Sequence, residues 1–286
     1  MVVIHIKRSD TDQFLFETTC TETNDNLIAK LVAIQNTRVK IRALAGAVRA
    51  LGKYGPMKPP DQQGLDEVED KFGEKPIPDR GEFYEADPTG IRTGEGVGPQ
   101  LVETLERVCA DAEQAISVNQ VQLRIAATQE NLDDKVANIR GAVTMAYPMG
   151  LPDYDVVRQL LEEGAQALEG TQPGQEVLDP ETAQLWGAGK EFRRGQCVSD
   201  RLGMNEKTKM VAKLQQSGAG APAREPAVSE DERKAMMAFY FKRQEEIKKL
   251  AEANDDDYLA SAWADPKSLQ RGLRGVGSIK APGVKP

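Results

Sequence analysis

The sequence predicts an α+β fold that is predominantly helical, with an N-terminal β-hairpin and helix, a helical region and an extended C-terminal tail. Three observations predict it. Apolar and polar residues alternate near the N-terminus, as they do in half-buried strands. Over most of the remaining chain, apolar residues recur every three or four positions, as they do in amphipathic helices. Residues 254–286 are rich in glycine, proline and lysine and hold few apolar residues, which is typical of an extended tail.

The first predicted domain covers residues 1–66. Residues 2–7 alternate as one strand and residues 13–18 as a second, so the two form a hairpin. A helix follows from Ile28 to Leu51, and the glycines and proline at 52–56 end it. A hairpin followed by a helix is how a β-grasp domain begins, and residues 55–65 resemble the stretch after the main helix of ubiquitin. A ubiquitin-like scaffold is therefore one interpretation of this domain.

The rest of the chain divides into three segments by composition. Residues 67–98 are acidic and rich in glycine and proline, which predicts a linker or a loop wrapped over a surface. Residues 99–253 are predicted to form a helical domain, and residues 254–286 a docking tail. Within the helical domain the apolar spacing predicts a short strand at 121–125 and helices at 99–116, 132–146, 156–168, 179–194, 205–216 and 229–253.

Composition limits the class of protein. Of the 286 residues, 40% are hydrophobic, only 5% are aromatic and 29% are charged, which suits helices with one apolar stripe better than an enzyme built on a wide, buried parallel sheet. The net charge of −8 argues against nucleic acid or an anionic membrane as the main partner. The sequence holds no apolar run of the roughly 18–20 residues that membrane insertion needs. The three scattered cysteines indicate reduced thiols, so a cytosolic compartment is expected.

Catalytic and cofactor sites are not expected. His5 is the single histidine, and it lies in strand alternation opposite the apolar positions, so a surface position is the simpler interpretation. A serine-histidine-aspartate site or a two-histidine metal site would have to use it. The glycine-rich segment 93–99 lacks the lysine and serine or threonine of a phosphate-binding loop. The sequence therefore predicts a protein that is not an enzyme and that needs no cofactor or metal.

Four residues are candidates for binding a partner. Lys207, Lys209 and Lys213 form a basic stretch without interleaved aromatic residues, so contact with an acidic protein surface explains it better than contact with nucleic acid. A plain solvated surface remains an equal alternative. Trp263 lies outside any periodic helix and is interpreted as an anchor that is buried on a partner or on the protein's own body. Trp186, in contrast, is assigned to the core of the helix predicted at 179–194.

Several blocks of sequence together resemble a known family. They are VVIHIKR at 2–8, PPDQQGL at 59–65, RGAVTMAYPMGLPDYD at 140–155, the stretch from AQLWGAGK to GAPAREP at 183–226, and NDDDYLASAWADPKSLQRGLRGVGSIK at 254–280. In this order they resemble the Kurly family, cilia- and flagella-associated protein 298, with the loosest match over 66–130. The resemblance implies a role in motile cilia, where dynein arms are not assembled or placed without the protein and the polarity of ciliary beating is affected. It supplies no catalytic residues.

The resemblance also implies partners and a location. The expected partners are axonemal dynein chains and dynein assembly factors, and the tubulin of the doublet microtubule is a further candidate. The expected location is the cytoplasm and the motile cilium, including the axoneme and basal body. The leading hypothesis is thus a non-catalytic protein that acts in the assembly, docking or placement of dynein arms. A ubiquitin-like signalling adaptor that affects cilium polarity indirectly is the alternative.

Overall fold

The computed structural model describes residues 1–63, 81–222, 230–252 and 267. The chain divides into two compact units, Met1–Ala223 and Arg224–Pro286. The first unit contains a five-stranded sheet and a group of packed helices, and the second contains the long helix α8 (Glu230–Glu252). The predicted α+β class with a predominance of helix is confirmed, as are the N-terminal hairpin and the helix after it.

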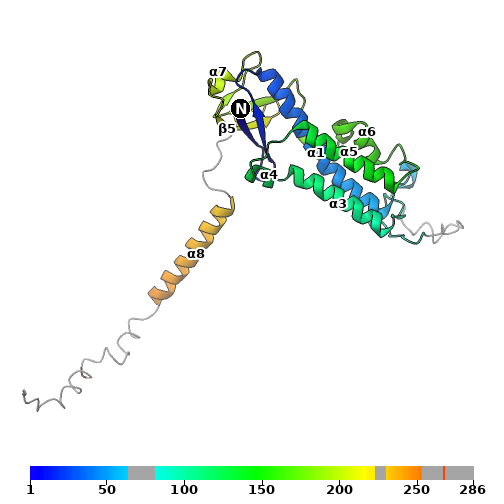
Figure 1. The fold of residues 1–286 in the computed structure, drawn as a ribbon. Coiled ribbons are helices and arrows are strands. Elements are labelled where there is room, and N and C mark those ends of the chain that lie inside the picture. Colours follow the sequence, from blue (N-terminus) through cyan, green and yellow to red (C-terminus); the bar gives the residue numbers. More distant parts are fainter. Residues whose placement is uncertain (64–80, 223–229, 253–266, 268–286) are drawn as a thin grey trace, which may run out of the picture. The chain divides into compact units, whose positions relative to one another are not determined.

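The sheet joins strands from the two ends of the first unit (Figure 1). The hairpin of β1 (Val2–Lys7) and β2 (Gln13–Thr18) is extended by β5 (Lys209–Gln215), β3 (Gln184–Gly187) and β4 (Lys190–Glu191) in the order β2-β1-β5-β3-β4. The central strands β1 and β5 are parallel, and the other pairs are antiparallel. This is the strand order of a β-grasp sheet. Its strands come from both of the segments that the sequence analysis separated as 1–66 and 99–253.

A single helix, α1 (Asn24–Tyr54), connects the sheet to the helical part of the unit. Its apolar stripe is buried from Leu27 to Leu51. The second half packs against α3 (Pro99–Ile116) and α5 (Gln129–Ala146), with α6 (Val156–Glu162) alongside. The helix ends at Gly55, which has φ +76°, and a Cβ there would collide with the carbonyl of Glu95. Glycine is therefore required at this stop because the left-handed backbone and the close approach both exclude a side chain.

Most of the predicted helices are present. α3 begins at Pro99, α5 covers the segment predicted at 132–146, and α8 corresponds to the segment predicted at 229–253. The helix predicted at 156–168 is split into α6 and the 3-10 helix η2 (Gly164–Leu168), because Gly164 has φ +75° and interrupts the α-helical ladder. The remaining short elements are η1 (Pro60–Gln62), η3 (Pro173–Glu176) and α7 (Ser199–Leu202).

Three predictions of local structure are wrong. The strand predicted at 121–125 is the short helix α4 (Asn119–Gln122) followed by a turn, with one bridge between Leu15 and Ala126. The helix predicted at 179–194 is the hairpin of β3 and β4, which turns through Ala188 (φ +50°) and Gly189 (φ +75°). The basic helix predicted at 205–216 is the strand β5. Lysine, methionine, alanine and leucine all favour helix locally, but pairing with β1 and β3 outweighs this preference.

The described part of the predicted linker, residues 81–98, lies on the end of α1. The Arg92 guanidinium donates to the carbonyls of Gly55 (2.8 Å) and Ala47 (3.3 Å) and lies 3.6 Å from the carboxylate of Asp155. Asp155 is fully buried, and it also accepts from the backbone N–H of Met57 (3.0 Å) and Val157 (2.8 Å). One carboxylate thereby holds the start of α6, the chain after α1 and the linker loop together.

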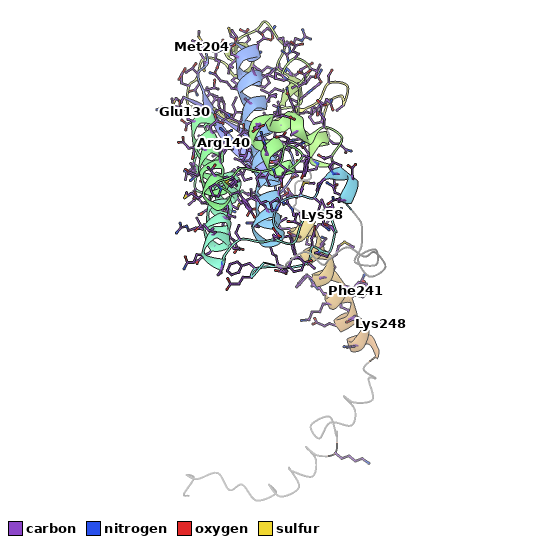
Figure 2. The ribbon with its side chains drawn as sticks, turned by 90° about the vertical axis from the view of Figure 1, so that its right-hand side faces the viewer. Lys58, Glu130, Arg140, Met204, Phe241 and Lys248 are labelled. Carbon is purple, nitrogen blue, oxygen red and sulfur yellow. The ribbon has the colours of Figure 1, made fainter. Side chains whose placement is uncertain are left out.

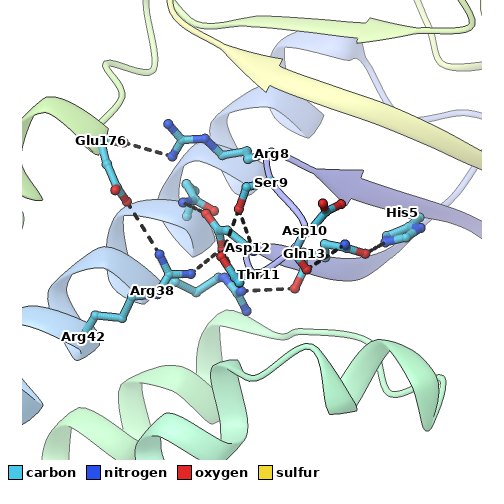
Figure 3. A network of polar contacts seen from close by, with 11 residues as sticks. His5, Arg8, Ser9, Asp10, Thr11, Asp12, Gln13, Arg38, Arg42 and Glu176 are labelled. Atoms are coloured by element: carbon cyan, nitrogen blue, oxygen red, sulfur yellow. Dashed lines mark hydrogen bonds and ion pairs between the residues drawn. The ribbon is translucent and has the colours of Figure 1, made fainter. Parts of the chain in front are cut away.

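A second buried charge cluster holds the β1–β2 turn on α1 (Figure 3). The Asp12 carboxylate accepts hydrogen bonds from Gln35 (2.9 Å), from Arg38 (2.9 Å) and from Arg42. Burial alone would raise the pKa of Asp12. The charges of Arg42 and Arg38, together with the hydrogen bonds from Arg38 and Gln35, outweigh burial and lower that pKa. The Arg38 guanidinium also lies over the Phe14 ring, 5.0 Å from its centroid. The turn of the hairpin is thus fixed to the middle of α1.

The second unit contrasts with this buried interior. Every side chain of α8 from Asp231 to Lys249 is exposed, including Phe241 (69%) and Met237 (67%). Figure 2 shows Phe241 and Lys248 projecting from the helix. No helix among the described residues is long and apolar enough to cross a membrane.

Candidate functional site

The candidate site is the side of the sheet that faces away from the core. Along β5, Ala212 and Leu214 are buried, so Lys209, Val211 and Lys213 project from the opposite side. The register places Val3 beside Lys209, His5 beside Val211 and Trp186 beside Lys213, while Leu15 lies beside His5 on β2. We call this surface the outer sheet face; it consists of Val3, His5, Leu15, Trp186, Lys209, Val211 and Lys213.

A groove of about 430 Å³ lies on the outer sheet face. Its second wall is the segment after α4, which is held along the edge of the sheet by the hydrogen bond from Ala127 N–H to the Leu15 carbonyl (2.7 Å). In this wall Arg124 adopts φ +59°, and Leu123 and Ile125 are exposed. The groove is lined by Val3, His5, Leu15, Glu17, Val121, Arg124, Ala126, Lys209, Met210 and Val211.

The groove is apolar at its centre and mainly basic at its border. Val211 is 52% exposed, and the residues that line the groove include two cations, Lys209 and Arg124, and one acid, Glu17. Lys213 lies outside the groove on the same face of β5. None of the ion pairs formed between described residues involves Lys209 or Lys213. A segment that offers apolar side chains flanked by carboxylates would therefore match both the shape and the charge of this face.

The structure separates the four predicted site residues. It brings Lys209 and Lys213 together on one face of a strand, with Val211 between them. Lys207 is exposed in the turn before the strand, where its backbone N–H donates to the Asn205 side-chain oxygen (3.0 Å). Trp263 lies outside the described residues, so its role stays a prediction.

The apolar half of this face is not apparent from the sequence. Trp186, which the sequence places in the core of a helix, is instead half-buried on β3, and its indole N–H donates to Gln184 (3.4 Å). The signal that could have found the face is the alternation in KMVAKLQ at 209–215, where every second residue is Met210, Ala212 or Leu214.

Other parts of the first unit are weaker candidates for a binding site than the outer sheet face. His5 is engaged by Gln13, with 3.0 Å between Nε2 and the amide oxygen. A larger cavity of about 730 Å³ is lined by residues of α1, α3 and the linker loop, but its two basic residues are already paired, Lys53 with Glu85 (2.8 Å) and Arg49 with Glu113 (2.6 Å). The described residues contain no group of histidine, cysteine, aspartate and glutamate that could hold a metal ion.

Comparison with known proteins identifies the same family that the sequence blocks resemble. The family described as "Cilia- and flagella-associated protein 298" matches residues 183–279, which include β3, β5 and α8. Full-length relatives carry the same name: the human and zebrafish (Danio rerio) proteins are each 41% identical, with 98% of this chain and 99% of theirs aligned. The Drosophila melanogaster protein is 37% identical, with 98% of each chain aligned. None of these three names is that of an enzyme.

No solved structure matches the chain. The human, zebrafish and Drosophila relatives align with 98% of this chain at 37–41% identity. The chain belongs to the cilia- and flagella-associated protein 298 family.

Proposed function

We propose that this protein is a non-catalytic component of motile cilia that acts in the assembly, docking or placement of axonemal dynein arms. The names of its relatives support the ciliary location. The observation that carries the binding role is the outer sheet face, where the central strand β5 presents the exposed Lys209 and Val211 beside the half-buried Lys213. Neither lysine has an ion-pair partner among the described residues. An exposed apolar surface with a charged border is typical of a site that is covered by another protein.

The chemistry of the face defines the partner. Lys209 and Lys213 favour an acidic surface, and Val211 with its neighbours favours an apolar side chain at the centre of that surface. Axonemal dynein chains, dynein assembly factors and the acidic outer surface of tubulin are the partner classes that we propose. We place the protein in the cytoplasm and in the axoneme and basal body of the motile cilium.

The double substitution Lys209→Glu with Lys213→Glu tests this proposal. In ciliated cells that lack their own copy, the unchanged chain should restore dynein arms, as seen by electron microscopy of axonemes, and the double variant should not. Each lysine at such a border contributes only about 0.2–1 kcal/mol, but reversing two charges adds repulsion to the loss. Because both side chains project from the outer sheet face, we expect the thermal midpoint of unfolding to change little.

Lys207→Glu is the matched control, since it makes the same charge change in the turn beside the outer sheet face. It should restore the arms almost as well as the unchanged chain. Equal rescue by the double variant and by the control would show that the outer sheet face is a solvated surface without a partner.

The β-grasp strand order supports a second candidate, the ubiquitin-like signalling adaptor. Both candidates use the same sheet, but they predict different defects. If the protein is an adaptor, cells that express the double variant should keep their dynein arms and lose only the common direction of ciliary beating.

A further inference from the structure

The long helix of the second unit carries an apolar band that surrounds it. Residues 235–241 read AMMAFYF, and seven consecutive apolar residues cover every side of an α-helix. Phe239, Tyr240 and Phe241 are each more than 60% exposed. Such rings bury about 150–250 Å² each, so the band exceeds the few hundred Å² of contiguous apolar surface that a soluble monomer usually exposes. An apolar band of this size is typical of a surface that binds another protein.

One stripe along α8 has the spacing of a coiled coil. Asp231, Lys234, Ala238, Phe241, Glu245 and Lys248 follow one another at alternating steps of three and four residues, which places all six on the same face of the helix. The order of their chemical types is acid, base, small apolar, large apolar, acid, base. In the reverse order the types are base, acid, large apolar, small apolar, base and acid. Each position of the stripe is thus matched by the opposite charge or the complementary size when the order is reversed.

This stripe is complementary to itself when a second copy is antiparallel. With the register centred between Phe239 and Tyr240, Asp231 lies opposite Lys248 of the second copy, Lys234 opposite Glu245, and Ala238 opposite Phe241. The two-fold symmetry repeats each layer, giving two apolar layers at the centre and two charged layers at each end. In a parallel pair every charged residue would instead meet its own kind. We propose that two copies of this protein associate through α8 as an antiparallel helix pair.

Side-chain size and net charge favour a second copy over a membrane surface as the binding partner of α8. The phenyl ring of Phe241 would fit into the space left by Ala238 of the other copy, which is the alternation of large and small residues that close helix packing needs. A membrane surface would attract a helix with a net positive charge, but α8 holds six acidic and six basic residues. The 23-residue helix is about 34 Å long, enough for these six layers. The inference concerns a different surface from the outer sheet face and does not depend on the proposed function.

The full-length chain should show this association in sedimentation equilibrium between about 1 and 100 µM, where a short helix pair is expected to dissociate. We expect dimers that revert to monomers on dilution. Lys234→Glu should weaken the dimer at least about tenfold, because symmetry creates two contacts between like charges. Glu245→Lys should do the same. A chain that carries both substitutions exchanges the charges within each pair and should recover the dimer.

Phe241→Ser removes the central layer and should give monomers. Met236→Ser on the opposite face of α8 is the matched control and should leave the dimer intact. Helical content from circular dichroism should be the same for the two variants, which separates loss of the contact from loss of the helix. A monomer at every concentration, or a charge-exchanged chain that stays as weak as the single variants, would overturn the antiparallel pair.

Discussion

Replacing Asp12 with alanine is expected to lower the free energy of unfolding by about 3–5 kcal/mol, because the change leaves the guanidinium of Arg38 buried without its carboxylate. Arg38 is only 1% exposed, and its partner Asp12 is 7% exposed. Gln35 loses its acceptor at the same time. Urea unfolding followed by circular dichroism measures the loss. Asp10→Ala is the matched control: Asp10 is exposed and pairs with Lys7 at 3.3 Å, so its removal should cost less than about 1 kcal/mol.

The same carboxylate should make stability depend on pH in one direction. Its pKa is lower in the folded chain than the ordinary value, so its contribution is complete above the ordinary pKa of about 3.9 and is lost as the pH falls toward the folded value. The difference in unfolding free energy between the unchanged chain and Asp12→Ala should therefore be greatest near neutral pH and shrink below about pH 4.

A double substitution tests whether the cluster stabilises the fold by pairing charges or by packing. Asp12→Leu combined with Arg38→Met replaces the two most deeply buried charges by apolar groups. It should recover much of the stability that Asp12→Ala loses, since the remaining Arg42 is partly exposed and still lies 3.5 Å from Glu176. A double variant that is less stable than Asp12→Ala would mean that the cluster contributes by packing and not by pairing.

Asp155→Ala is expected to lower the free energy of unfolding by a similar amount, about 3–5 kcal/mol, because this fully buried carboxylate accepts two backbone hydrogen bonds and forms an ion pair with Arg92. The backbone N–H groups of Met57 and Val157 lose their acceptor, and Arg92, which is 7% exposed, keeps its charge but loses the buried carboxylate that pairs with it. Burial lowers the pKa of Arg92, and the nearby charges of Asp155 and Asp87 act in the opposite direction. Removing Asp155 thus removes the charge that offsets the burial of the Arg92 guanidinium.

Hydrogen exchange can show which segments are destabilised by Asp155→Ala. Amides in α6 and in the described loop 81–98 should lose protection more than those of the β1–β2 hairpin, because Asp155 joins those two segments. Asp155→Asn keeps one oxygen for the Val157 N–H and should cost less than alanine. Asp153→Ala, whose side chain is 89% exposed, should cost little. Equal losses for Asp153→Ala and Asp155→Ala would contradict the role assigned to the buried carboxylate.

The candidate site could be predicted only in part. Charge alone identified Lys209 and Lys213, because a run of lysines is visible in any window of the sequence. It could not identify Val211 or Trp186 as their neighbours, since the register that aligns them joins β5 with β1 and β3. Val3 and Lys209 are adjacent in the sheet although about two hundred residues of chain separate them. No local pattern of sequence reports such a pairing.

The sequence by itself determined the elements whose stability is local. The N-terminal alternation determined the hairpin, the apolar spacing determined α1, α3, α5 and α8, and the blocks of motif residues determined the family. The tertiary structure decided that 209–215 is a strand and not a helix, and that Asp12 and Arg38 lie together in the interior. The physical reason is range: helix spacing and caps act within a few residues, whereas strand pairing and buried charge pairs depend on groups that only the folded chain brings together.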